Sequence, residues 1–410
     1  MALTEALRAG SWLTRERVRL VALAVLAASL LGLVWLIATS DGLNDAQGRP
    51  LGTDFSNVYA AGTYVLEGNP AAPFDPARQL ARERAIFGAD TPFYGWHYPP
   101  FFLGLAALLA TMPYWLALLV WQGATLALYL WVMRGIAGRG DPLWLLAAVA
   151  FPAVFINLGH GHNGFLTAAL FAGALLQLDR RPIVAGVLFG LLAYKPQFGL
   201  LIPLALAAGG CWRSFAAAAA TVALMALAAT LAFGTEVWTA FLASGTFTRD
   251  VVLEQGGTGW HKIQSVFSWV RMWGGGVTLA YVVQGIVAAA VAVTLARLWR
   301  GNAAFALKAA ALLIGTLLAT PYSLDYDLML LAPAIALLAA DAMQRGFAPW
   351  QKTLLAALWL MPLVARSAAE TTMIPLAVPL LLAAFAMILA LARISVFGNP
   401  AGVKPLSGAL

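Results

Sequence analysis

Residues 19–39 read RLVALAVLAASLLGLVWLIAT, and this stretch decides the class of fold. An apolar helix of about 20 residues crosses the roughly 30 Å hydrocarbon layer of a membrane. The run is longer than the apolar core of a signal peptide, so we predict an uncleaved first span. Arginines precede it at four positions, Arg8, Arg15, Arg17 and Arg19. Positive charge favours the cytoplasmic flank of a span, which places the predicted N-terminus in the cytoplasm.

The composition extends this prediction to the whole chain. Of its 410 residues, 61% are hydrophobic and 10% are charged, with a mean hydropathy of +0.81. The net charge of +7 comes from small basic groups between apolar runs, which is typical of cytoplasmic loops rather than of nucleic-acid binding. The only cysteine, Cys211, excludes an intramolecular disulfide, and no Cys/His spacing resembles a zinc site. We predict an all-α polytopic membrane protein in a lipid bilayer, with no nucleic-acid partner, metal or cofactor.

Apolar runs recur along the rest of the chain. They cover residues 114–133, 142–158, 164–178, 183–210, 215–233, 277–296, 303–320, 328–340, 353–365 and 373–392. Lys195-Pro196 predicts a broken helix within the run 183–210, because proline removes a helix donor and lysine is unfavourable in lipid. We therefore predict about 12 membrane helices or half-helices. They form a single transmembrane domain over residues 1–392, followed by a cytoplasmic tail over residues 393–410.

The short apolar run at residues 99–112 sets the predicted topology. A full span there would put Arg134 and Arg180 outside the cell, whereas a re-entrant segment within a long first outer loop, 40–113, keeps basic loops inside. The inside segments then hold 16 of the 25 Lys and Arg residues and 5 of the 18 Asp and Glu residues. We predict a multi-pass protein of the bacterial inner membrane, with both termini cytoplasmic and the active site on the outer, periplasmic side.

The segment TDFSNVY, at residues 53–59, begins the polar part of this outer loop. The spacing of Phe55, Val58 and Tyr59 predicts a helix on the membrane surface, and Gly68-Asn69-Pro70 would end it. Asp54 at the helix start has two interpretations. It either caps free backbone N–H groups or presents a functional carboxylate.

Two polar segments carry three of the four histidines. Residues 94–102, YGWHYPPFF, resemble an interfacial aromatic belt, but a belt gives no reason for His97. Residues 159–164, GHGHNG, form a tight turn with His160 and His162. Half a metal site, a plain polar turn and hydrogen bonding to a sugar or phosphate are the alternatives. We favour the last over metal because no second matched pair of ligands exists.

Other charged and polar residues lie near the predicted outer boundary. Lys195 stands within an apolar run, where an ionisable residue indicates function unless its amine reaches the interface. The other charged and polar residues near this boundary are His261, Lys262, Gln264, Asp325, Asp327 and Arg366.

These residues fit a sugar donor linked to a lipid phosphate. The phosphate would sit at the interface, where lysine and histidine can neutralise it, while its chain stays in the bilayer. Phosphate is a good leaving group, so the reaction mainly needs a base for the acceptor hydroxyl, and Asp54 could supply it. The chain contains no Walker loop and no dinucleotide glycine motif.

An ordered series of short motifs carries a family resemblance. The motifs are Asp54-Phe55, Val58-Tyr59-Ala60-Ala61, Gly68-Asn69-Pro70, Tyr98-Pro99-Pro100, Gly159-His160 with Asn163, and Ala185-Gly186 through Gly190 to Lys195-Pro196. Over about residues 19–340 the chain resembles glycosyltransferase family 87, polyprenol-phosphate-dependent mannosyltransferases of the GT-C class.

The resemblance implies a GT-C-type fold with interfacial helices in the first periplasmic loop and a catalytic aspartate at Asp54. It implies inverting transfer of a hexose, mannose first, from a polyprenyl phosphate sugar to a glycolipid or glycan acceptor. The donor phosphate would bind near Lys195, His261 and Lys262. The other expected substrate-binding residues are His97, Tyr98, His160, His162, Asn163, Gln264, Asp325, Asp327 and Arg366.

Two other classes of protein share some of these features. A secondary transporter of a small polar or anionic solute also has broken helices and intramembrane charge, but no repeated pair of interrupted helices is present here. A non-catalytic envelope assembly protein would not need the clustered His, Lys and Asp residues.

Overall fold

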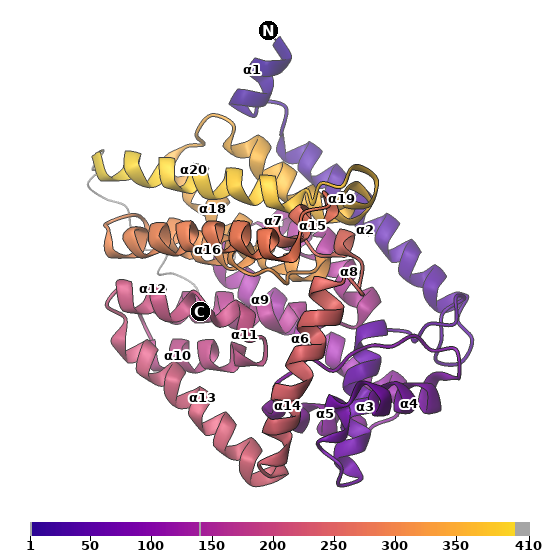
Figure 1. Ribbon diagram of the computed structural model, residues 1–410. Coiled ribbons are helices and arrows are strands. Elements are labelled where there is room, and N and C mark those ends of the chain that lie inside the picture. The colour runs from indigo at the N-terminus through magenta and orange to yellow at the C-terminus, as the bar shows by residue number, and fades with distance from the viewer. Residues whose placement is uncertain (1, 139–140, 398–410) are drawn as a thin grey trace.

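The computed structural model describes residues 2–138 and 141–397, and these residues form helices and connecting loops without a β-strand (Figure 1). Isolated bridges such as that between Ile263 and Leu324 occur. The prediction of an all-α chain is confirmed.

Six helical segments of the described chain are long and apolar enough to cross a membrane. They are α2 (Arg15–Ala38), α6 (Tyr114–Ala137), α13 (Trp212–Phe233), α16 (Val277–Arg300), α19 (Gln351–Thr372) and the segment Asp325–Arg345, made of η6 (Asp325–Leu330) and α18 (Leu331–Arg345). A bent pair, α7 (Pro142–Val149) and α8 (Pro152–His160), forms a seventh candidate with a 44° angle. The chain is thus a multi-pass membrane protein.

Shorter apolar helices account for the other predicted runs. They are α9 (Gly164–Gln177), α10 (Pro182–Leu191), α12 (Ile202–Ala208), α17 (Phe305–Ala319) and α20 (Ala377–Phe397). The predicted break at Lys195-Pro196 is present, because η3 (Leu192–Tyr194) ends before Lys195 and α11 (Pro196–Gly199) starts after it. The first five residues of the predicted tail, 393–397, belong to α20, and residues 398–410 lie outside the described part.

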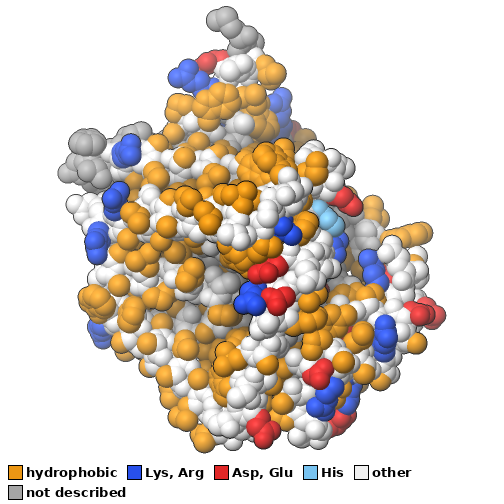
Figure 2. Space-filling view, in the orientation of Figure 1, with side chains coloured by type: hydrophobic (Ala, Val, Ile, Leu, Met, Phe, Trp, Pro, Cys, Tyr) orange, Lys and Arg blue, Asp and Glu red, His pale blue; other side chains and the backbone are white. Residues whose placement is uncertain are grey.

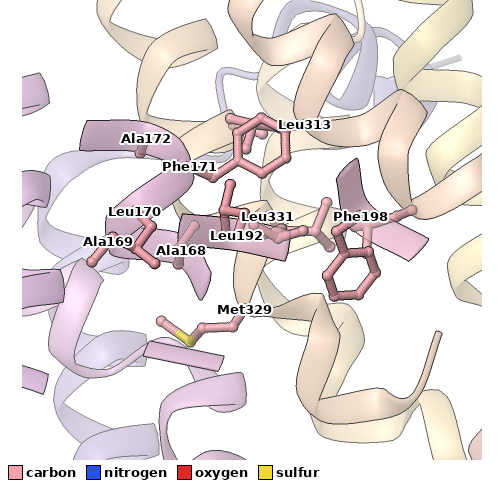
Figure 3. Packing of buried hydrophobic residues seen from close by; sticks show 14 of the residues in the cluster. Ala168, Ala169, Leu170, Phe171, Ala172, Leu192, Phe198, Leu313, Met329 and Leu331 are labelled. Carbon is pink, nitrogen blue, oxygen red and sulfur yellow. The ribbon is translucent and has the colours of Figure 1, made fainter. Parts of the chain in front are cut away.

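The central packing uses small and large apolar side chains in turn. Figure 3 shows Ala168, Phe171 and Ala172 of α9 facing Leu192, Leu313 and Leu331 from three other elements. Small residues also allow close helix contact, since a Cβ on Gly186 of α10 would come within 2.4 Å of the Ser214 carbonyl oxygen of α13.

Residues 40–113, the predicted first outer loop, fold into a compact group of helices at one end of the molecule (Figure 1). These are α3 (Thr53–Leu66), η1 (Ala72–Phe74), α4 (Pro76–Phe87), η2 (Pro100–Phe102) and α5 (Leu103–Ala110). Tyr59 of α3 donates a hydrogen bond to the Met112 carbonyl oxygen at 2.9 Å. A Cβ on Gly62 would overlap the carbonyl of Ala106, so α3 and α5 touch backbone to backbone.

Two features of α3 differ from the prediction. The first is its burial: α4 and α5 cover α3, and eight of its residues, including Phe55, Val58 and Tyr64, are buried instead of lying on the membrane surface. The predicted end of the helix before Gly68 is present. Its N-cap is Gly52, with φ +70°, and no side chain caps the helix. The interpretation of Asp54 as an N-cap is wrong, because the left-handed glycine turns the chain directly into the helix.

The helical segment Pro100–Ala110 extends roughly 16 Å at 1.5 Å per residue, about half of a hydrocarbon layer. This length suits the re-entrant placement on which the topology depends. In Figure 2, Lys and Arg side chains line the left edge, where no acidic side chain is visible, whereas basic and acidic side chains are mixed at the top, centre and right.

Candidate active site

Asp54 is the second residue of α3, and its half-buried carboxylate is unpaired. It makes no hydrogen bond or ion pair with any residue that the structure describes. Its neighbour Thr53 joins α3 to the end of α8, with 2.8 Å between Thr53 Oγ1 and His160 Nδ1. The turn at Gly52 packs beside Gly161, where a Cβ on either glycine would meet Leu118. Asp54 is therefore fixed by its backbone while its carboxylate stays available.

The surroundings of Asp54 raise its pKa above the ordinary value. Burial is the main cause, and the electrostatic interaction with His160 opposes it. Asp325 adds to the rise, whereas Lys195 and Lys262 lower the pKa. A carboxylate whose pKa is raised towards neutrality is a stronger base than an exposed one.

A cavity of about 500 Å³ opens beside Thr53 and His160. Its apolar walls come from α2, α8 and α19, with Leu36, Phe155 and Leu363 among them. Its polar residues are Asp45, Arg49, Thr53, His160, Asp325, Arg366 and Ser367, with Ser29 on the α2 wall. The cavity therefore connects surfaces of membrane helices with a charged region next to Asp54.

Arg49 at this cavity is a residue that the sequence analysis missed. Asp45 holds it, since Arg49 Nε and Nη2 donate to Asp45 Oδ2 at 2.9 and 2.7 Å. Burial tends to raise the pKa of Asp45, but the hydrogen bonds from Arg49 and from the backbone outweigh it and lower the pKa. The spacing of Asp45 and Arg49, four residues apart in a polar loop, was the available signal.

Arg366 and Asp325 were both predicted, and the structure brings them together. Arg366 Nη1 lies 3.8 Å from Asp325 Oδ2, and Asp325 Oδ1 accepts the Tyr326 N–H at 2.9 Å. Lys262 lies in the same electrostatic neighbourhood. Burial and the charge of Arg366 lower its pKa, while Asp325 and Asp54 raise it.

The segment η5 (Trp260–Lys262) carries His261 and Lys262 towards this region. A backbone bond from Gln264 N to Ser323 O, 2.7 Å, pairs it with the chain before Asp325. The Gln264 side chain binds backbone atoms of His261, Ala365 and Ala377. Gln264 thus holds η5 against α19 and α20, and its amide has no described atom of the cavity as a partner.

Lys195 and Asp327 are buried and paired with each other. The distance between Lys195 Nζ and Asp327 Oδ1 is 2.6 Å, and Asp327 Oδ2 accepts the Leu324 N–H. The Lys195 amine also lies over the ring of Tyr326, 5.5 Å from its centre. The carboxylate of Asp327 therefore balances a lysine that was expected to face the donor phosphate.

The remaining predicted residues lie around Tyr98 and Tyr326. Asn163 Nδ2 donates to the Tyr98 hydroxyl at 2.7 Å, and the His162 ring stacks on Tyr326 with centres 3.5 Å apart. Asn163 Oδ1 and His162 Nδ1 are buried without a hydrogen-bond partner. Unpartnered polar atoms of this kind could receive sugar hydroxyls.

His97 is placed differently from its neighbour Tyr98. Its Nδ1 lies 2.8 Å from Thr248 Oγ1, in the π-helix Thr248–Glu254 that follows α14 (Glu236–Phe247). Burial lowers the pKa of His97 to about 4, so the ring is neutral at pH 7. His97 therefore links the segment 94–102 to the π-helix Thr248–Glu254. Within residues 2–138 and 141–397, no three His, Cys, Asp or Glu side chains are grouped as metal ligands.

The fold and the site together define a multi-pass membrane protein with an unpaired carboxylate next to Thr53, which lines a cavity between apolar helices and charged residues. Comparison with protein families then identifies it: the family described as Glycosyltransferase family 87 matches residues 96–321, more than half of the chain, and the chain belongs to this family. It is therefore a membrane glycosyltransferase. No curated protein and no solved structure matches it. The match contains His160, Lys195 and Lys262 but begins after Asp54 and ends before Asp325.

Proposed function

We propose that this glycosyltransferase moves a hexose, mannose first, from a polyprenyl phosphate sugar to a hydroxyl of a glycolipid or glycan. The reaction would take place on the outer face of the bacterial inner membrane, within a GT-C-type fold, and would invert the sugar. Family membership supports glycosyl transfer over a transporter or an assembly protein. The choice of donor rests on the cavity.

The observation that carries the donor class is the composition of that cavity. A polyprenyl chain could lie against the apolar surfaces of α2, α8 and α19 without leaving the bilayer. In the same cavity, the Arg49 and Arg366 side chains offer positive charge to a phosphate, and His160 also lines the cavity. A soluble nucleotide sugar would not need the apolar walls.

The proposed chemistry uses Asp54 as a general base. Its carboxylate takes the proton of the acceptor hydroxyl while the acceptor oxygen attacks C1 of the sugar. The bond between C1 and the phosphate oxygen breaks, and polyprenyl phosphate leaves with the bonding electrons. Attack opposite to the leaving group inverts C1. Arg49, Arg366, Lys262 and His261 would stabilise the charge that develops on the phosphate.

The pair Lys195 and Asp327 has a different part in this proposal. Because Asp327 neutralises Lys195, the lysine contributes less net charge to a phosphate than Arg49 or Arg366 does. The pair lies under Tyr326, which stacks with His162. We assign it to holding Tyr326 and the η6 turn, next to the sugar.

The test measures sugar transfer by purified protein in lipid nanodiscs. It compares three radiolabelled donors: polyprenyl phosphate mannose, polyprenyl phosphate glucose and a nucleotide sugar. Asp54→Asn should lower the rate by at least ~100-fold, the usual loss for a general base. Asp90→Asn, at an exposed aspartate of the same loop, is the matched control and should stay at the wild-type rate. Equal transfer by Asp54→Asn and wild type would reject the base, and use of the nucleotide sugar alone would reject the donor class.

A further inference from the structure

Glu83 of α4 is a buried carboxyl group that the proposed chemistry does not use. Its exposed fraction is 0%, as is that of Gln79 one turn earlier, and Asn57 of α3 is 6% exposed. The three residues lie where α4 packs on α3. Asn57 is three residues beyond Asp54 along α3. Burial of an acidic residue is unfavourable unless its contacts offset the loss of water.

Glu83 connects three segments of the outer loop through hydrogen bonds. The Tyr94 backbone N–H donates to Glu83 Oε2 at 3.0 Å. Gln79 Nε2 donates to Glu83 Oε1 at 3.3 Å and to the Asn57 carbonyl oxygen at 3.1 Å. The orientation of the Gln79 amide is thereby fixed, because its oxygen cannot face a carbonyl. One side chain thus ties the loop before His97 to α4 and, through Gln79, to α3.

Tyr94 is the reason that this connection matters for the site. Burial raises the pKa of its phenol to about 12, and the charges of Asp54 and Arg49 both act on it, in opposite directions. The phenol therefore stands in the electrostatic neighbourhood of both residues. Its hydroxyl forms no hydrogen bond with the described residues. A half-buried phenol on the loop that Glu83 holds can bind a sugar hydroxyl or stack on a sugar ring.

Among the residues that the structure describes, no cation faces Glu83 from the elements packed around it. From α4 the facing group is Gln79, from the loop it is the Tyr94 N–H, and from α3 it is Asn57 through Gln79. The nearest arginines of α4 have other partners: Arg82 forms an ion pair with Glu67, and Arg84 donates a hydrogen bond to the Thr91 carbonyl oxygen. Burial raises the pKa of Glu83 to about 8 against these hydrogen bonds, so the carboxyl is mostly neutral at pH 7.

We propose that Glu83 is a positioning residue for the glycosyl transfer, which holds the Tyr94 backbone so that the phenol contacts the acceptor sugar next to Asp54. This inference rests on the proposed function. The acceptor would be a sugar hydroxyl reaching the cavity from the side of the loop 91–98. Glu83 itself touches neither donor nor acceptor.

The first test measures the loop directly and needs no substrate. Hydrogen exchange of peptides covering residues 91–98 should be faster in Glu83→Ala than in wild type, because the Tyr94 amide loses its acceptor. Glu83→Gln keeps an acceptor oxygen for the Tyr94 amide but turns its NH2 group towards the Gln79 NH2 group, so its exchange should lie between that of wild type and that of Glu83→Ala. Glu67→Gln, at the exposed end of the same α3–α4 hairpin, is the control and should leave this peptide unchanged. Equal exchange in Glu83→Ala and wild type would overturn the positioning role, whatever the substrate is.

The second test separates acceptor binding from the chemical step. Tyr94→Phe and Glu83→Ala should each raise the acceptor KM about 3- to 10-fold, the usual effect of one hydrogen bond, with a smaller change in kcat. An unchanged KM in both variants, in protein whose transfer still depends on Asp54, would reject the inference and leave the proposed function intact.

Discussion

Lys195 Nζ lies 2.6 Å from Asp327 Oδ1, although the two residues are 132 positions apart, and both side chains are buried. One partner follows the break in the apolar run 183–210, and the other lies in the η6 turn before α18. The ion pair thus ties two membrane segments together directly below Tyr326.

Breaking this pair from one side should destabilise the protein strongly. Lys195→Met leaves a buried carboxylate without its cation, a change that costs about 3–5 kcal/mol. The double variant Lys195→Met/Asp327→Asn should recover part of the loss, because no buried charge remains. Thermal unfolding in detergent measures both. Arg249→Gln, which breaks an exposed pair with Asp250, is the control and should change the melting temperature little. A double variant less stable than the single one would contradict the explanation.

His160 should set the acid limit of activity through Asp54. Asp54 must be ionised to act as a base, so the rate falls as pH drops through its pKa. The electrostatic interaction with His160 lowers that pKa, and His160→Asn removes the interaction. The acid limb of the pH–rate profile should therefore move to higher pH in His160→Asn. Thr53→Ser keeps the hydroxyl that faces His160 and should keep the wild-type profile. A shift to lower pH in His160→Asn would show that the sign is wrong.

Hydropathy was enough to locate the helices. All eleven apolar runs correspond to helices or broken helices, because a membrane segment has to be apolar over most of its length whatever its neighbours are. The break at Lys195-Pro196 followed from backbone chemistry alone. Hydropathy did not give the number of membrane crossings, because several helices are shorter than a hydrocarbon layer is thick. Whether such a helix crosses the membrane depends on its packing.

Side-chain partners were much harder to foresee. The pair of Lys195 with Asp327 depends on the packing of elements distant in sequence. The start of α3 was misinterpreted because Thr, Asp and Asn are common N-cap residues. In the structure Gly52 occupies the N-cap position, so no side chain caps the helix. Arg49 was missed since its importance comes from the cavity, which forms only when α2, α8 and α19 come together.

The two cavity arginines should act on the donor rather than on the acceptor. Arg49→Gln and Arg366→Gln should each raise the KM for the lipid-linked donor about tenfold, near the value of one hydrogen bond to a charged group. Arg180→Gln is the control, because this exposed arginine lies in the short turn between α9 and α10. Steady-state kinetics at fixed acceptor concentration give the KM values. An unchanged donor KM in both cavity variants would move the phosphate away from this cavity.

The predicted topology can be checked with single cysteines in a Cys211→Ser background. Pro100–Ala110 is too short to cross the bilayer, so α2 and α6 should be consecutive crossings with the loop between them outside. A membrane-impermeant maleimide should label Asp90→Cys in intact cells. Arg134→Cys, at an exposed position in the last turn of α6, and Arg180→Cys, at an exposed position beyond α9, should react only after permeabilisation. Labelling of Arg134→Cys from outside would make Pro100–Ala110 a full crossing and reverse the sides assigned to every later loop.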